Sequence, residues 1–187
     1  ETLLEQVKIK YNADVTYGGY GEDRSDLWRN FEVSSRSMIH LGVDVNNLQP
    51  KTPICCPVDC EVIHVMQDDT KLNGWGGRVI FRLQKPFLEC DYLLVGHLQD
   101  LPMCGQKFAA GDYFAQVALS EINGGWFAHV HFQLIKQSMM KIYENNLCLL
   151  DGYLLDKDIQ NGVSLSEWSA DPTSLLFREN VQQNFNA

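Results

Sequence analysis

The sequence has no long apolar run and little positive charge. No stretch approaches the roughly eighteen apolar residues that a membrane-spanning helix needs. Fifteen Lys and Arg residues stand against 24 Asp and Glu residues, which gives a net charge of −9, and the basic residues form no cluster. Because proteins bind a phosphate backbone through clustered basic side chains, nucleic acid is not an expected partner.

Cysteine is too scarce for a disulfide-rich scaffold, with six residues in 187. Three of them, Cys55, Cys56 and Cys60, lie close together but lack the repeated C-x-x-C pairs of a structural zinc site. We interpret them as small apolar residues in or beside buried strands rather than as metal or redox groups. The chain opens at Glu1 without a methionine or an apolar leader, so we expect a trimmed chain; a removed signal peptide and an upstream domain both stay open.

Short apolar runs separated by Gly, Pro, Asn and Asp dominate the middle of the chain. Hydrophobic residues make up 45% and charged residues 21%, a composition that excludes a disordered chain. The length of the runs and their β-branched and aromatic content predict strands, and their spacing predicts a mainly antiparallel, β-sandwich-like structure. The expected strands span residues 38–45, 60–66, 78–83, 92–98, 113–119 and 128–135.

Outside this middle part, the sequence lacks the pattern of short apolar runs. A short helix is expected over residues 138–150, because apolar residues recur there at helical spacing. The polar stretch after Ser166 is expected to wrap the surface. We therefore predict a single domain over residues 1–187, with an all-β core at about 37–137 and irregular terminal extensions at 1–36 and 138–187.

Three of the five histidines fall into patterns. His40 and Asp44 form an H-x-x-x-D pattern, and His129 and His131 form an H-x-H pattern. In a strand, residues i and i+2 share a face about 6.6 Å apart, so the two imidazoles of H-x-H converge. A regular strand would place residues i and i+4 about 13 Å apart, rather far for one metal ion, so the hypothesis requires a bend at Gly42.

The two remaining histidines, His97 and His64, have different sequence surroundings. His97 ends an apolar run and could join the same site, whereas His64 alternates with apolar residues and is interpreted as structural or exposed. Two imidazoles and a carboxylate are a standard ligand set for catalytic zinc, with water in the fourth position. A further neutral histidine could then accept a proton from that water. The competing interpretation is a set of buried structural histidines.

These motifs resemble those of the lysostaphin/LytM-type zinc metallopeptidases, which cut peptide cross-links of bacterial cell walls. The resemblance covers residues 39–134, about half of the chain, and cysteines stand where the family usually has alanine and glycine. The matching blocks, in chain order, are IHLGVD at 39–44, KTPI at 51–54, PVDCEV at 57–62, VGHL at 95–98, GQKFAAGD at 105–112 and GWFAHVHF at 125–132.

The resemblance implies a fold, a cofactor and residue roles. The fold would be the all-β duplicated hybrid motif, and Zn²⁺ would be bound by His40, Asp44 and His131. His129 would act as general base, while His97 would assist water activation or stabilise the transition state. The implied activity is endopeptidase cleavage of peptidoglycan cross-links or stem peptides.

The outer segments carry a second resemblance. Residues 20–24, 123–126 and 170–176 look like a subgroup of peptidase-like domains that are found fused beside kinase-like and aminotransferase modules. Domains of that subgroup have no settled substrate, so a cell-wall substrate does not follow automatically from the zinc motif. The family resemblance points to the cell envelope, whereas six cysteines and no visible leader are compatible with the cytoplasm or a larger parent chain.

Two other functions share these residues. A peptide- or glycan-binding module could keep the metal ligands and use the groove for recognition. A phosphocarrier of the same fold family would use one histidine as phosphate acceptor and would not need the H-x-H strand, which argues against it.

Several residues near the motifs are open to two interpretations. Trp75, Trp126 and Phe127 lie in Gly-rich loops and could form groove walls or pack on the edge of the sheet. Glu22 and Arg24 could position or block substrate, but an internal salt bridge is the preferred interpretation.

Overall fold

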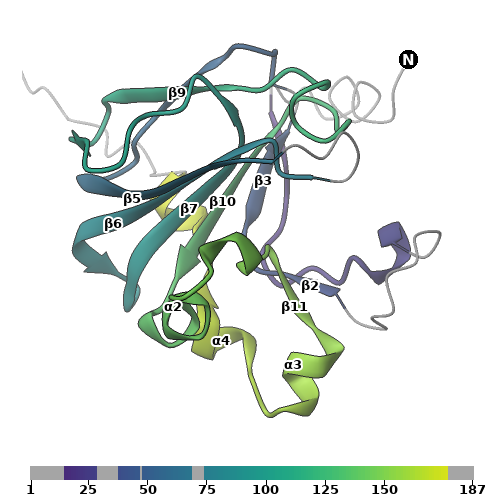
Figure 1. Ribbon diagram of the computed structural model, residues 1–187. Helices are drawn as coiled ribbons and strands as arrows, with labels where there is room; N and C mark the ends of the chain where they lie inside the picture. The colour runs from purple at the N-terminus through teal and green to yellow at the C-terminus, as the bar shows by residue number, and fades with distance from the viewer. Residues whose placement is uncertain (1–14, 29–37, 47, 69–73, 177–187) are drawn as a thin grey trace, which may run out of the picture.

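A large antiparallel sheet forms the centre of the computed structural model, which describes residues 15–28, 38–46, 48–68 and 74–176 (Figure 1). The strands follow the order β1-β3-β10-β7-β6-β5-β8, with β12 beside β10 and with β9 joining β7 to β4. The strands of this sheet are β1 (Thr16–Gly18), β3 (Val43–Asn46), β4 (Pro53–Cys55), β5 (Cys60–Gln67), β6 (Gly77–Phe87), β7 (Cys90–Gln99), β8 (Lys107–Phe108), β9 (Tyr113–Val117), β10 (Val130–Ile135) and β12 (Ser169–Ala170).

A second, two-stranded sheet and several short helices complete the described part of the chain. The small sheet pairs β2 (Met38–His40) with β11 (Tyr153–Leu155). The helices are η1 (Ser25–Trp28), α2 (Gln137–Tyr143), η2 (Leu147–Leu149), α3 (Asp156–Gln160), α4 (Leu165–Trp168) and α5 (Thr173–Leu176).

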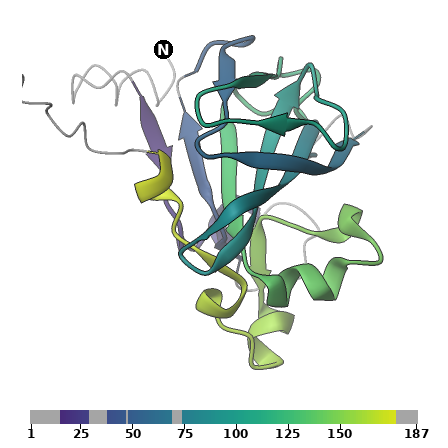
Figure 2. The same cartoon turned by 90° about the vertical axis from the view of Figure 1, so that its left-hand side faces the viewer.

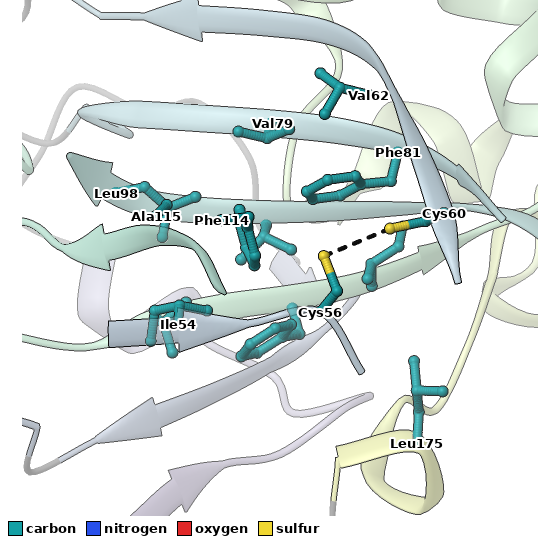
Figure 3. Packing of buried hydrophobic residues seen from close by; sticks show 14 of the residues in the cluster. Ile54, Cys56, Cys60, Val62, Val79, Phe81, Leu98, Phe114, Ala115 and Leu175 are labelled. Atoms are coloured by element: carbon teal, nitrogen blue, oxygen red, sulfur yellow. Dashed lines mark hydrogen bonds between the residues drawn. The ribbon is translucent and has the colours of Figure 1, made fainter. Parts of the chain in front are cut away.

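The central strands are buried on both faces, and alternate residues enter two different cores. On one face, Val79 and Phe81 of β6 pack with β7, β9 and β4, as the close view in Figure 3 shows in part. On the other face, Ile80 packs against α2, α4 and β11. Both overall views place α2 and α4 on the side of the sheet away from β9 (Figures 1 and 2). Because both faces of these central strands are covered by other parts of the protein, their sequences are nearly continuous apolar runs.

The cysteine cluster belongs to the first of these cores. Cys56 and Cys60 are buried, and their sulfur atoms lie 3.5 Å apart as free thiols (Figure 3). Cys55 is exposed at the end of β4. Burial beside a second thiol raises the pKa of Cys56, with the hydrogen bond to Cys60 as the larger cause. The interpretation of small, largely buried residues beside strands therefore fits two of the three cysteines.

The prediction of an all-β, mainly antiparallel core is confirmed, since every strand pair in the described residues is antiparallel. Each of the six expected strands has a counterpart. The expected strand at 38–45 is divided into β2 and β3, which pair with different partners. The break falls at Leu41 and Gly42, where the bend was required.

Two expectations for the C-terminal part need correction. The helix expected over 138–150 is shorter: α2 ends at Tyr143, and a turn separates it from η2. The stretch after Ser166 does more than wrap the surface, because β12 pairs with β10 and both Trp168 and Leu175 are buried. A few large apolar side chains anchor this polar segment to the sheet.

The division into a core at about 37–137 and two extensions stays a prediction. Residues 1–14, 29–36 and 177–187 of the expected extensions lie outside the described residues. The described parts of both extensions nevertheless add strands: β1 lies beside β3, and β11 lies beside β2. Among the described residues, no helix has the length and apolarity to cross a membrane.

Candidate metal centre

The break at Gly42 brings His40 and Asp44 to the same point from two strands. His40 ends β2, where it lies opposite Tyr153 of β11. Asp44 lies within β3, opposite His131 of β10. A side chain at Gly42 would overlap the backbone oxygen of Phe132 and the ring of His131, so only glycine permits this approach. The predicted bend is thus the feature that assembles the three residues.

Three potential ligand atoms converge at this point. His40 Nε2 lies 3.1 Å from His131 Nδ1, which lies 2.9 Å from Asp44 Oδ1. The third side of the triangle, from His40 Nε2 to Asp44 Oδ1, is 3.5 Å. Ligands at about 2.0–2.1 Å from a tetrahedral zinc ion are about 3.3 Å from one another. The spacing of the three atoms therefore matches one face of a zinc coordination tetrahedron.

Hydrogen bonds on the far side of each ring set its tautomer. His40 Nδ1 lies 2.9 Å from the carbonyl oxygen of Gly19, which can only accept, so Nδ1 carries the proton. His131 Nε2 lies 3.2 Å from Oε1 of Gln133. The Gln133 amide nitrogen donates to the carbonyl oxygen of Asp151, so Oε1 faces His131 and Nε2 of that ring carries the proton. In neutral rings, His40 Nε2 and His131 Nδ1 then present lone pairs to each other and to Asp44.

The electrostatics of Asp44 and His131 favour the ligating forms of these two groups. Burial would raise the pKa of Asp44, but hydrogen bonds and attraction from His131 and His40 hold that pKa well below its ordinary value. Burial lowers the pKa of His131, against the opposing effect of Asp44. Without a cation between them, a ring nitrogen that faces Asp44 has to carry a proton, as the lowered pKa of Asp44 requires, and a bound cation takes the place of that proton. The donor set, its spacing and its outer hydrogen bonds therefore fit a divalent ion such as zinc.

His97 reaches the site through a β-bulge. Gly77 of β6 lies opposite Leu98, while the next residue, Arg78, lies opposite Gly96, so His97 is the extra residue on β7. Its φ is 65°, in the left-handed region where glycine is usual. The bulge re-aims the strand, so that Leu98 enters the first core while the His97 ring stacks on Trp75. Backbone strain of this kind is typical of functional sites.

His129 lies directly against His97. The two ring centroids are 4.0 Å apart, and His129 Nδ1 lies 2.8 Å from the carbonyl oxygen of Phe127. The proton therefore sits on Nδ1 of His129, and Nε2 keeps a lone pair. Burial lowers the pKa of His129, and burial together with the neighbouring His129 lowers the pKa of His97 well below its ordinary value. Both rings are therefore neutral at pH 7, and Nδ1 of His97 has no hydrogen-bond partner within the described residues.

Trp75 connects the two halves of the site. Its ring is stacked on His97, with centroids 5.4 Å apart, and meets His131 edge-on at 5.0 Å. Gly96 leaves room for it, since a side chain there would overlap the indole. Phe127 is half exposed and lies 5.0 Å from the His129 ring, so it borders the site as the sequence suggested. Trp126 instead donates to the carbonyl oxygen of Gly74, which ties two loops together.

All five histidine and aspartate residues predicted for the site thus lie together. His64 is on β5, which β6 and β7 separate from β10 in the sheet. Sequence reasoning missed the outer partners Gly19 and Gln133, although Gln133 follows His131 at a spacing of two on the same face of β10. That spacing was the available signal for Gln133, whereas a backbone carbonyl such as that of Gly19 leaves none.

The fold and the site define an all-β protein with a candidate two-histidine, one-aspartate metal centre. Several solved structures are similar to it. One is LytU, with 20% identity over 84% of this chain and 92% of that chain and a TM-score of 0.49. Another is lysostaphin, with 17% identity over 66% of this chain and 44% of that chain and a TM-score of 0.49. No family model matches the chain, and no curated protein matches it in sequence.

Proposed function

We propose that this chain is a zinc-dependent endopeptidase that hydrolyses peptide bonds, with peptidoglycan cross-links or stem peptides as substrate. The observation that carries the proposal is the convergence of three potential ligand atoms from His40, Asp44 and His131, with distances of 2.9 to 3.5 Å between them. The choice of peptidoglycan rests on the resemblance of the sequence motifs.

His40, Asp44 and His131 would hold the zinc ion. Bound there, zinc would supply Lewis-acid polarisation of a peptide carbonyl and a lowered pKa for water. His129 supports hydrolysis because its protonated Nδ1 is held by Phe127, so that Nε2 can accept a proton from the attacking water. The proton can then pass from His129 to the departing amine.

His97 supports the same reaction in a second role. Its ring is held between Trp75 and His129, and its Nδ1 is buried and unpaired within the described residues. A neutral imidazole held in this way can hydrogen-bond the attacking water or the developing oxyanion. A module that only binds peptide would have no need for a second pair of oriented, neutral histidines.

Cleavage of purified peptidoglycan tests the proposal, since each hydrolysed peptide bond releases one amine that can be labelled and counted. His129→Ala should keep its zinc and lose about 10²- to 10⁴-fold in turnover, because only the proton acceptor is removed. His131→Ala should lose both zinc and turnover. His64→Ala is the matched control and should behave like the wild-type protein, because His64 lies on β5 outside the site.

Two results would contradict the assigned mechanism. A His129→Ala protein as active as wild type would remove the general base. Zinc-loaded wild-type protein that binds peptidoglycan without releasing amines would favour the binding module instead.

A further inference from the structure

Arg24 holds the oxygen of Asp44 that does not face the two imidazoles. Its Nη1 donates to Asp44 Oδ2 at 2.5 Å, while Oδ1 of the same carboxylate faces His40 and His131. The side chain of Arg24 is only 11% exposed, so the pair is shielded from water. The two oxygens of Asp44 are therefore assigned to different partners.

Other contacts fix the guanidinium in this position. Nε and Nη2 of Arg24 each lie 3.0 Å from Oε2 of Glu22, which satisfies the predicted internal salt bridge. Burial lowers the pKa of Arg24, but attraction and hydrogen bonding from Asp44, and then from Tyr153, raise it above its ordinary value. Arg24 is thus a permanent cation that is held from three sides.

The neighbouring strand leaves space for this guanidinium. Gly18 of β1 lies opposite Asp44 in the register of β1 with β3. A Cβ atom at Gly18 would lie 2.3 Å from Nη2 of Arg24 and 3.6 Å from Oδ2 of Asp44. A side chain at this position would displace Arg24, so the strand and the arginine fit each other.

A carboxylate can bind a metal ion through one oxygen or through two. A catalytic zinc site needs three protein ligand atoms and an open fourth position. We propose that Arg24 is a positioning residue that restricts Asp44 to one ligating oxygen and so keeps the fourth position open for water and substrate. This inference rests on the proposed metal-dependent function.

Cobalt-substituted protein provides a direct test, because four-coordinate Co²⁺ absorbs visible light much more strongly than five- or six-coordinate Co²⁺. The wild-type protein should give the intense spectrum. Arg24→Met frees the second oxygen of Asp44 and should give the weak spectrum. Mn²⁺ favours more oxygen ligands than zinc does. The ratio of the zinc affinity to the Mn²⁺ affinity should therefore be about tenfold or more lower in Arg24→Met than in the wild-type protein.

Gly18→Ala tests the position of the guanidinium apart from its charge, because the new methyl group displaces Arg24 but the positive charge remains. This variant should weaken the cobalt absorption as Arg24→Met does. It also provides the test if Arg24→Met does not fold. Arg82→Met removes an exposed arginine of β6 and should leave the spectrum unchanged. Far-ultraviolet circular dichroism checks that each variant is folded.

The possible failures can be told apart. Wild-type protein that binds no cobalt would overturn the proposed metal site itself. An intense spectrum and an unchanged zinc preference in both folded variants would overturn the role of Arg24 and leave the metal site standing.

Discussion

At the scale of single residues, hydrogen bonds behind the rings decide which nitrogen of each buried histidine could ligate a metal ion. His40 and His131 each donate from one ring nitrogen to an oxygen behind the ring, so the other nitrogen is the one available to a metal ion. His129 does the same through Phe127. Oxygen acceptors behind a ligating imidazole set its orientation and raise its basicity. The backbone and Gln133 are therefore as much part of the candidate centre as the rings themselves.

The buried histidines also make the stability of the metal-free protein depend on pH. Burial and the nearby His129 hold the pKa of His97 well below 6.5 in the folded state, so the unfolded chain binds the proton first as the pH falls. The unfolding free energy should therefore decrease from pH 7 downward, by up to about 1.4 kcal/mol per pH unit for each such histidine. It stops decreasing on this account once the folded-state pKa is passed.

His97→Asn should reduce this slope, because asparagine does not titrate. The measurement is urea denaturation of the chelator-treated protein at pH 7, 6 and 5, with wild type and variant in parallel. An identical slope in the two proteins would show that His97 is already protonated in the folded state at these pH values.

The sequence predicted the histidines and the aspartate of this site, but not the groups that form hydrogen bonds to them. H-x-H and H-x-x-x-D are visible as spacings, because strand geometry places residues i and i+2 on one face. The Gly19 carbonyl leaves no trace in the sequence, and Arg24 was expected to pair internally without Asp44 being named as its partner. Such contacts depend on loops that bring distant segments together, which residue spacing does not encode.

Two interruptions of regular strands build the site at the scale of elements. The break between β2 and β3 lets His40 and Asp44 meet, and the bulge in β7 turns His97 toward Trp75. The first was predicted, because the H-x-x-x-D spacing is too long for one strand. The second was not, because a bulge at a non-glycine residue has no sequence signature; it was detected only from the register of β6 with β7.

Gly42→Ala tests the first interruption. The new Cβ would lie 2.3 Å from the carbonyl oxygen of Phe132 and 2.6 Å from Cε1 of His131, so the backbone or the ring has to move. We expect a loss of about 1–3 kcal/mol in unfolding free energy, together with weaker zinc binding. Denaturation and zinc titration on the same samples measure the two effects.

Gly19→Ala is the matched control for that substitution. A Cβ at Gly19 meets nothing within 4 Å, and the backbone carbonyl that accepts from His40 is kept. Wild-type stability and zinc binding in Gly42→Ala would contradict the close approach of β2, β3 and β10.

In the whole molecule, described segments on both sides of the motif region complete the site. The first described segment supplies Gly19 and Arg24, while β11 pairs with His40 and Gly152 packs beside the His131 ring. The sequence motifs covered only residues 39–134, so they could not show this. The all-β class was predictable from apolar runs, whereas the strand order depends on long-range pairing that periodicity does not determine. The described residues 15–28 and 151–155 are thus structural parts of the candidate centre.

Zinc content of the purified protein, measured by elemental analysis, tests the central claim most directly. We expect about one zinc ion per chain in the wild-type protein, none in His131→Ala, and the wild-type amount in His64→Ala. Zinc absent from the wild-type protein, even after it is added back at neutral pH, would contradict the metal centre and the hydrolytic function built on it.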